Sequence, residues 1–403
     1  MSQLSVARSP TRAGAPGRRA ALPVWCAWAA LFVNVLAFSS SPTVIPIPGI
    51  LGQLITQGSL PAALVLALLA NRHALIKPNV FLLALTLLAV VAAMVSIHNE
   101  FVIGSSFRAT RFLGFVAVLW LLTPWWGRRD MVLLRYHRAC LGLVLMLVCL
   151  GALARPGMAF GSDNRLTGII WPIPPTQVAH YAAVMLGTTV VLWMCRVIGG
   201  RSALMWVILS VGVLVATHTR TALVAVVAGL GCALISLFLS QARVRRTFLV
   251  GGVASGVVAL LFASEIRSWA LRGQTAQEAG QLTGRTKVWT EVLHTPRAPV
   301  HELFGSGLSN LSWNGLPIDS TWVGTYLDEG LFGVVLVAAA LILLLLSALS
   351  DRPGPGRAIA VFLIVYCLFA SVTETGLGAP SPYLLDLAAA ASLLRVPPKG
   401  EWR

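Results

Sequence analysis

Long apolar runs with few charges recur along the whole chain, and they restrict its fold more than any other feature. Only 11% of the residues are charged and 57% are hydrophobic, whereas roughly 25% of a soluble domain is charged. The mean hydropathy is +0.81. A run of roughly 20 apolar residues can cross a bilayer as a helix, and a backbone in lipid must satisfy its own hydrogen bonds. The sequence therefore predicts a polytopic helical membrane protein.

The apolar runs predict an all-α transmembrane bundle of about twelve helices. One large polar loop, residues 265–320, separates the ninth run from the tenth. We expect a disordered basic tail at 1–22, a transmembrane domain at 23–396 that includes this loop, and a short tail at 397–403. The predicted spans lie near residues 24–40, 50–70, 79–96, 111–125, 132–153, 174–194, 203–218, 221–240, 247–264, 321–349, 358–375 and 383–396.

The distribution of cations predicts the orientation in the membrane. With the N-terminus inside, 20 of the 30 Lys and Arg residues fall on the cytoplasmic side, as the positive-inside rule requires. Both termini are then cytoplasmic, the first apolar run is a retained signal anchor rather than a cleaved signal peptide, and the large loop faces outward. The ten outer cations are Arg108, Arg111, Arg155, Arg165, Arg220, Arg267, Arg272, Arg285, Lys287 and Arg297.

The outer face also collects acidic residues, and this mixture favours an anion-binding site. The net charge of +16 is high, but its cations flank hydrophobic spans, so we do not expect nucleic acid as a partner. Positive-inside sorting does not account for the ten outer cations, and binding an anion is the simplest reason for them. The carboxylates on or near that face are Glu100, Asp163, Glu265, Glu278, Glu291, Glu302, Asp319, Asp328, Glu329 and Glu374.

Arg220 is the most informative single residue, because a few polar residues separate two strongly apolar runs around it. A charge at membrane-interface depth usually has a partner or a ligand, although a guanidinium can also reach lipid phosphate at the interface. Arg165 and Arg285 are ambiguous in the same way, and for each alone a loop salt bridge with a nearby carboxylate is the commoner explanation. Arginine matches phosphate oxygens with two parallel hydrogen bonds, so several arginines at one membrane-level site would suit a diphosphate.

Two histidines near the outer face are candidate bases. His218 lies two residues from Arg220, whose charge would lower its pKa, and His180 is more typical of a helix–helix hydrogen bond inside a bundle. No HExxH, GxSxG, Walker or Asp-x-Asp sequence occurs, and the first outer loop has no carboxylate. We therefore expect no bound metal and no cofactor.

Short motifs in the second half of the chain resemble the O-antigen ligase and polymerase superfamily. Arg-Leu-Thr-Gly at 165–168 is similar to the family's Arg-Leu-x-Gly segment, and Thr-His-Thr-Arg-Thr-Ala at 217–222 resembles its Thr-x-Ser-Arg-Gly-Ala hairpin. Gly284-Arg285 with Trp289 and the Gly-Ser-Gly at 305–307 match its large-loop pattern. The segments Asp-Ser-Thr-Trp at 319–322 and Glu-Gly-Leu-Phe-Gly at 329–333 resemble its closing motifs.

The resemblance implies a GT-C-like fold and a glycan transferase of the bacterial cytoplasmic (inner) membrane. Such enzymes move a glycan from a polyprenyl diphosphate, such as undecaprenyl diphosphate, to an acceptor hydroxyl on the outer face. The implied reaction is inverting and metal-independent, and the partners are the lipid-linked donor, a lipid or glycan acceptor and the bilayer. Whether the chain is a ligase or a polysaccharide polymerase stays open.

The site residues follow from the same resemblance. Arg220 and Arg285 would bind the diphosphate in catalysis, with Arg165 supporting them, and fixed guanidinium groups would stabilise the charge on the leaving group. Asp319 stands where the family has a histidine base, so a carboxylate would take the proton. The base could also be His218 or a glutamate.

His218, Lys287 and Trp289 complete the predicted substrate-binding set. We expect a helix around Arg285 to Leu293, because apolar residues recur there at helical spacing. Trp289 would rest on the membrane interface while Arg285 points toward the pocket.

Two other functions fit the sequence less well. A transporter or flippase of lipid-linked glycan, or a carrier of small anions, would show internal repeats and charges near the middle of the membrane. No repeat is present, and the charges cluster at the outer interface, with Asp386 in the last predicted span as the exception. A structural partner of a synthase complex would not require Arg220, Arg285 and Asp319 to converge.

Overall fold

The protein is mostly helical in the computed structural model, which describes residues 18–39, 43–98, 101–161, 163–238, 242–271, 284–309 and 311–394. Six helices among these residues are long and apolar enough to cross a membrane. They are α2 (Gly49–Ala70), α4 (Val102–Leu121), α5 (Val132–Ala154), α7 (Pro175–Met194), α9 (Arg220–Phe238) and α15 (Thr321–Ser350).

Shorter apolar helices complete the bundle. They are α1 (Arg18–Asn34), α3 (Val80–Ser96), α8 (Gly200–Ala216), α16 (Pro355–Ala370) and α17 (Pro382–Leu393), and α10 (Ala242–Leu261) precedes the large loop. Local sequence explains several of their starts. The Asn79 side chain accepts a hydrogen bond from the Leu82 amide, and Ser381 caps α17 in the same way at Leu384. Such caps satisfy amides that a helix leaves unpaired at its first turn.

Each predicted apolar range contains a helix, but several boundaries differ. Helix α1 begins at Arg18, inside the predicted tail; residues 1–17 and 395–403 lie outside the described residues. Helix α4 starts at Val102 rather than near 111, because its two arginines have partners within the protein and do not end the helix. Helix α16 ends at Ala370, so residues 371–381 form a connection between two short helices.

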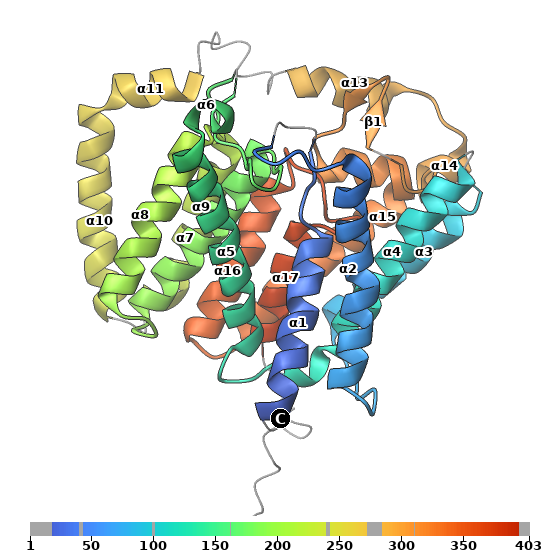
Figure 1. The fold of residues 1–403 in the computed structure, drawn as a ribbon, viewed down its shortest axis with the longest axis horizontal. Coiled ribbons are helices and arrows are strands. Elements are labelled where there is room, and N and C mark those ends of the chain that lie inside the picture. Colours follow the sequence, from blue (N-terminus) through green and yellow to red (C-terminus); the bar gives the residue numbers. More distant parts are fainter. Residues whose placement is uncertain are drawn as a thin grey trace, which may run out of the picture.

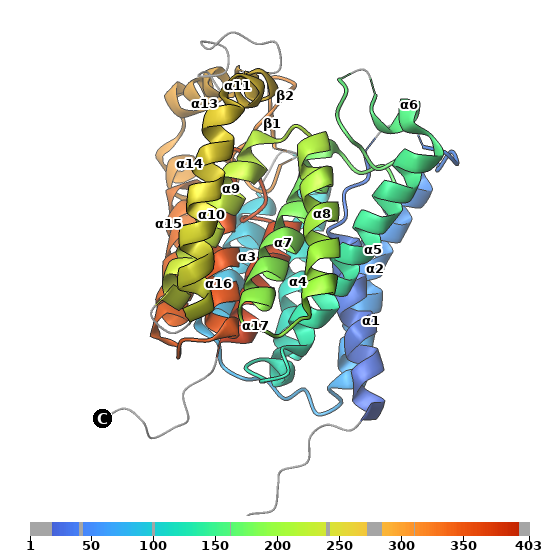
Figure 2. The same ribbon diagram turned by 90° about the vertical axis from the view of Figure 1, so that its left-hand side faces the viewer.

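The two ends of the bundle differ in structure. The first turn of α1 and the last turn of α17 lie at one end (Figures 1 and 2). The short helices α6 (Pro156–Ala159), α11 (Ala263–Leu271), α13 (Arg285–His294) and α14 (Pro299–Phe304) lie at the opposite end, with the hairpin of β1 (Ser312–Trp313) and β2 (Leu316–Pro317). We call this the loop-bearing end. The described parts of the predicted 265–320 loop therefore form a folded layer over one end of the helices.

Close helix packing at the centre of the bundle depends on glycines. Gly187 on α7 and Gly229 on α9 both lie against the ring of Phe362 on α16, and a Cβ at either position would overlap this ring or its backbone. Phe362 and Tyr366 are fully buried. Small residues let helices approach closely in a membrane, where packing supplies much of the association energy.

Helix α15 is broken at Gly330, and the segment after α14 packs into the break. Gly330 has φ 69° and ψ −168°, which is not helical. The amides of Ser306 and Gly307 donate to the carbonyls of Leu327 and Asp328 at 3.0 and 2.9 Å. The 305–307 segment is therefore docked onto α15 by backbone hydrogen bonds.

Replacing Gly305 by alanine should destabilise the protein strongly. Its φ is +80°, and a Cβ would overlap the backbone of Asp328 and Glu329. The backbone conformation alone costs roughly 1–3 kcal/mol for a residue with a side chain, and the overlap adds to this. Thermal unfolding in detergent measures the effect. Gly212→Ala on α8 is the matched control, because the added methyl group meets nothing within 4 Å beyond the adjoining backbone of its own helix, and it should leave the melting temperature unchanged or raise it. Equal melting of both variants would contradict the docking.

Candidate functional site

Arg285 lies at the first turn of α13 and connects three segments of the loop-bearing end. Gly284, with φ 85°, turns the chain into this helix. The Arg285 Nε atom is 3.1 Å from Oδ2 of Asp319, and its NH1 donates to the carbonyl of Thr373 at 2.8 Å. Residues 284–285, 319 and 373 are distant in sequence, so this contact builds a site from three separate segments.

An apolar cluster holds α13 in place. Val288 and Val292 on α13 pack with Val323 and Leu327 on α15, with Ile318 between them. The helix predicted around residues 285–293 is confirmed, and its apolar spacing faces α15 rather than lipid. This packing fixes the helix start, so the guanidinium of its first residue is positioned by the folded core.

Glu374 is the central acid of the site. It lies in the connection after α16, where Arg285, Asp319 and Arg165 all act on it electrostatically. Burial raises the pKa of Glu374 to about 7, while Arg285 and Arg165 lower it and Asp319 raises it. A carboxyl group with this pKa is half ionised near neutral pH, which is the condition that suits proton transfer.

Arg165 approaches the same acid from the loop before α7. Its Nε donates to the carbonyl of Thr217 at 3.0 Å, and its NH2 donates to the Thr219 hydroxyl at 3.2 Å. Burial lowers the pKa of Arg165, which Glu374 partly offsets and Arg285 reinforces. The two guanidinium groups repel each other, and the carboxyl group of Glu374 acts on both. A bound anion would reduce this repulsion.

The turn between α8 and α9 contacts the Arg285 site through a threonine. Arg220 is the first residue of α9 and is partly buried. The hydroxyl of the next residue, Thr221, hydrogen-bonds the hydroxyl of Thr373 at 2.7 Å. Since the carbonyl of Thr373 also accepts from Arg285, one residue connects the α9 start to the Arg285 site. We call Arg165, Arg220, Arg285, Asp319 and Glu374 the outer cluster.

The remaining predicted binding residues are placed less centrally. His218 has φ 48° and stacks on Trp269 of α11, with ring centroids 5.3 Å apart. Trp289 packs against the apolar cluster under α13, and Lys287 is exposed on the same helix. His180 makes the helix–helix hydrogen bond that its position predicted, to Tyr366 on α16.

A small pocket adjoins the outer cluster. It has a volume of about 20 Å³, room for one water-sized group, and is lined by Leu308 and Leu311, by hydroxyl and carboxylate side chains of α15 and by the connection at 375–379. The Thr321 hydroxyl, in this lining, donates to the carbonyl of Glu374 at 2.8 Å. Both oxygens of the fully buried Glu329 lack a hydrogen-bond partner among the described residues. These acceptors suit the binding of hydroxyl groups.

Several other outer cations have partners within the protein, which corrects the view that anion binding is the simplest reason for them all. Arg108 donates to the carbonyl of Leu308, and Arg111 donates to the side chain and backbone of Asn34. Arg297 lies over the rings of Trp313 and Tyr326. These arginines contact carbonyls or aromatic rings of other segments, so a bound anion is not needed to explain their presence.

Comparison with known proteins adds no family assignment, because no protein-family model and no curated protein matches this chain. The described residues also contain no group of three or more His, Cys, Asp or Glu side chains that could hold a metal ion.

Proposed function

We propose that the protein transfers a glycan from a polyprenyl-diphosphate carrier to an acceptor hydroxyl, as an O-antigen ligase or polysaccharide polymerase does. The observation that carries this proposal is the outer cluster, in which Arg165 and Arg285 act on a carboxyl group whose pKa burial raises to about 7. Arg220 begins the helix whose next residue, Thr221, hydrogen-bonds Thr373 beside that carboxyl group. The outer cluster lies at the loop-bearing end of a bundle whose helices are long enough to cross a membrane. A lipid-linked diphosphate would reach such a site while its lipid tail stays in the bilayer.

The arginines supply the electrostatic part of the reaction. The acceptor oxygen forms a bond with the anomeric carbon as the bond from that carbon to the diphosphate oxygen breaks. Negative charge then builds on the leaving diphosphate. Arg285 uses Nε and one terminal nitrogen for contacts within the described chain, which leaves its other terminal nitrogen for a phosphate oxygen. Guanidinium groups fixed in this way stabilise developing charge without a metal.

Glu374 is the base that the geometry favours. Asp319 holds the Arg285 guanidinium, so its carboxylate is occupied by an ion pair. Glu374 has a pKa of about 7 and adjoins the pocket that suits an acceptor hydroxyl. We therefore propose that Glu374 takes the acceptor proton, while Asp319 positions Arg285. Attack from the face opposite the diphosphate inverts the anomeric carbon.

The proposed setting is the bacterial cytoplasmic membrane, with the loop-bearing end outside and both termini in the cytoplasm. The excess of cations on the predicted inner side supports this orientation. The described helix ends nearest the two termini share the end opposite the outer cluster, as this topology requires (Figure 2).

A transfer assay tests the function. Purified protein reconstituted in vesicles, given a polyprenyl-diphosphate oligosaccharide and an acceptor glycan, should release free polyprenyl diphosphate and form the joined product. Chelation by EDTA should leave the rate unchanged. The proposal fails if neither product forms, and its metal-free part fails if EDTA stops the reaction and added Mg²⁺ restores it.

A second candidate is proton-coupled transport of the lipid-linked glycan, which a buried acid–histidine cluster within the helices favours. The same vesicles discriminate the two functions. A transporter would move labelled donor between leaflets without cleaving it, whereas a transferase would consume the donor.

A further inference from the structure

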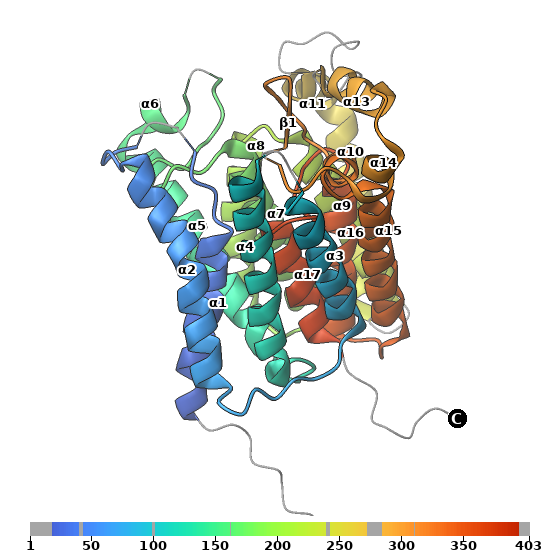
Figure 3. The ribbon, with the colours of Figure 1, turned by 90° about the vertical axis from the view of Figure 1, so that its right-hand side faces the viewer.

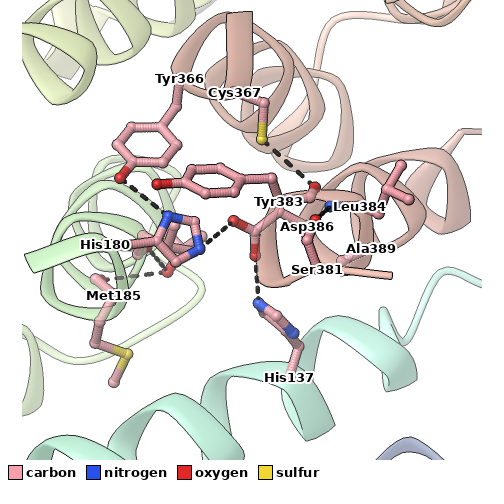
Figure 4. Close-up of polar contacts among 12 residues, drawn as sticks. His137, His180, Met185, Tyr366, Cys367, Ser381, Tyr383, Leu384, Asp386 and Ala389 are labelled. Atoms are coloured by element: carbon pink, nitrogen blue, oxygen red, sulfur yellow. Dashed lines mark hydrogen bonds and ion pairs between the residues drawn. The ribbon is translucent and has the colours of Figure 1, made fainter. Parts of the chain in front are cut away.

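A second polar cluster lies inside the helix bundle, where Asp386 meets two histidines (Figure 4). Asp386 on α17 contacts His137 on α5 through Oδ1 at 2.8 Å and His180 on α7 through Oδ2 at 3.1 Å, in each case at Nε2. The side chains of these three residues are at most 2% exposed. We call them the buried triad.

The surroundings of the buried triad are apolar or neutral. Helix α1 presents Trp28 and Phe32, whose rings meet His137 edge-on. The titratable neighbours on the other packed helices are neutral phenols and a thiol: Tyr181 on α7, Tyr366 and Cys367 on α16, and Tyr383 on α17. Among the described residues, the charged partners of Asp386 are the two histidines. No arginine or lysine of the described chain therefore balances its carboxylate.

Charge balance then decides the protonation of the triad. If Asp386 is ionised and both histidines are neutral, one net negative charge is buried between helices, where an unbalanced charge is costly. One additional proton makes the triad neutral. Because the three groups interact directly, that proton belongs to the cluster as a whole.

The hydrogen bonds indicate where the additional proton resides. The Nδ1 atom of His180 is 3.1 Å from the Tyr366 hydroxyl, which can accept from a protonated nitrogen as well as donate to a bare one. His137 has no hydrogen-bond partner for Nδ1 within the described part of the chain. A proton at His180 therefore gains an acceptor, whereas one at His137 does not.

We infer that the buried triad is a proton-binding site whose bound form is an imidazolium at His180, paired with the Asp386 carboxylate. Both Nε2 atoms lie within ion-pair distance of a carboxylate oxygen, at 2.8 and 3.1 Å, so one additional proton is held close to the Asp386 charge. The triad connects α5, α7 and α17, and Tyr366 adds α16. The bound proton thus neutralises the contact that holds four helices together. This inference does not depend on glycan transfer.

Nitrogen NMR of ring-labelled histidine tests the site in the full-length protein in nanodiscs. The chain has seven histidines, and the five outside the triad are exposed or partly exposed. Near pH 8.5, about two units above the usual histidine value, exposed imidazoles are neutral. The proposal predicts one ring with both nitrogens protonated under these conditions. A spectrum in which every ring is neutral would overturn it.

Variants locate the proton. His137→Gln should keep the imidazolium signal, and His180→Gln should lose it; the reverse pattern would overturn the assignment to His180. Asp386→Asn should also lose the signal. If that variant does not fold, Tyr366→Phe serves instead, because it removes the acceptor at Nδ1 without adding charge. It should weaken the imidazolium signal at pH 8.5, and an unchanged signal would contradict the role of Tyr366.

Discussion

Replacing Arg285 by alanine should lower the rate of glycan transfer by about 10²–10³-fold, the usual cost of removing one preorganised donor to a developing negative charge. The guanidinium joins Asp319 to the carbonyl of Thr373 and leaves one terminal nitrogen for the diphosphate. Arg285→Lys keeps the charge but loses the planar fork, so it should recover only part of the activity. Release of free polyprenyl diphosphate by the reconstituted protein measures both variants.

The matched control for Arg285 lies on the same helix. Thr290 is exposed, and its hydroxyl bonds only to the carbonyl of Thr286 within the described structure. Thr290→Ala should transfer glycan at the parent rate. If Arg285→Ala melts at the parent temperature and retains full activity, Arg285 has no part in catalysis.

Replacing Glu374 by glutamine should lower the rate of transfer by about 10²–10⁴-fold, the usual contribution of a general base, and remove the dependence of the residual rate on pH. With a base of pKa about 7, kcat/KM should rise about tenfold per pH unit below that value and level off above it. The control is the parent protein assayed over the same range with the same lipid. If the rise of kcat/KM with pH survives unchanged in Glu374→Gln, the proton transfer belongs to another group.

Protein stability gives an independent check on Glu374, because the substitution that lowers activity should raise stability at high pH. Its folded-state pKa is raised above the ordinary value of 4.5. The stability that this group contributes is therefore fully present below pH 4.5 and is lost as the pH rises through about 7. Glu374→Gln should remove this loss, so the variant should be more stable than the parent near pH 8 while transferring glycan more slowly. A merely structural carboxylate would give a slower and less stable variant.

Hydropathy predicted the helix positions well because lipid imposes one dominant requirement on each span. It misplaced the start of α4 since Arg108 and Arg111 have partners that only the folded chain supplies. It also gave no sign that Gly305 and Gly330 face each other across the break in α15. The two glycines are the sequence signal of this backbone docking, and their spacing does not show that they meet.

The candidate site was predictable in part. Arg285 and Asp319 were selected from short motifs, and the structure brings them to 3.1 Å. Glu374 was counted only as one of many outer acids, because its importance comes from the connection between α16 and α17 folding back onto Arg165 and Arg285. The unusual sequence Thr-Glu-Thr at 373–375, polar between two apolar runs, was the available signal. The role of His218 stays a prediction; its ring stacks on Trp269.

Binding of a short-chain polyprenyl diphosphate to the purified protein in EDTA tests the central claim most directly. Two or three guanidinium groups that converge on one site should hold a diphosphate more tightly than the matching monophosphate. The account predicts this preference in the parent protein and its loss in Arg220→Ala and in Arg285→Ala. Equal affinity for the two lipids, or a preference that both variants keep, would contradict a diphosphate site at the outer cluster.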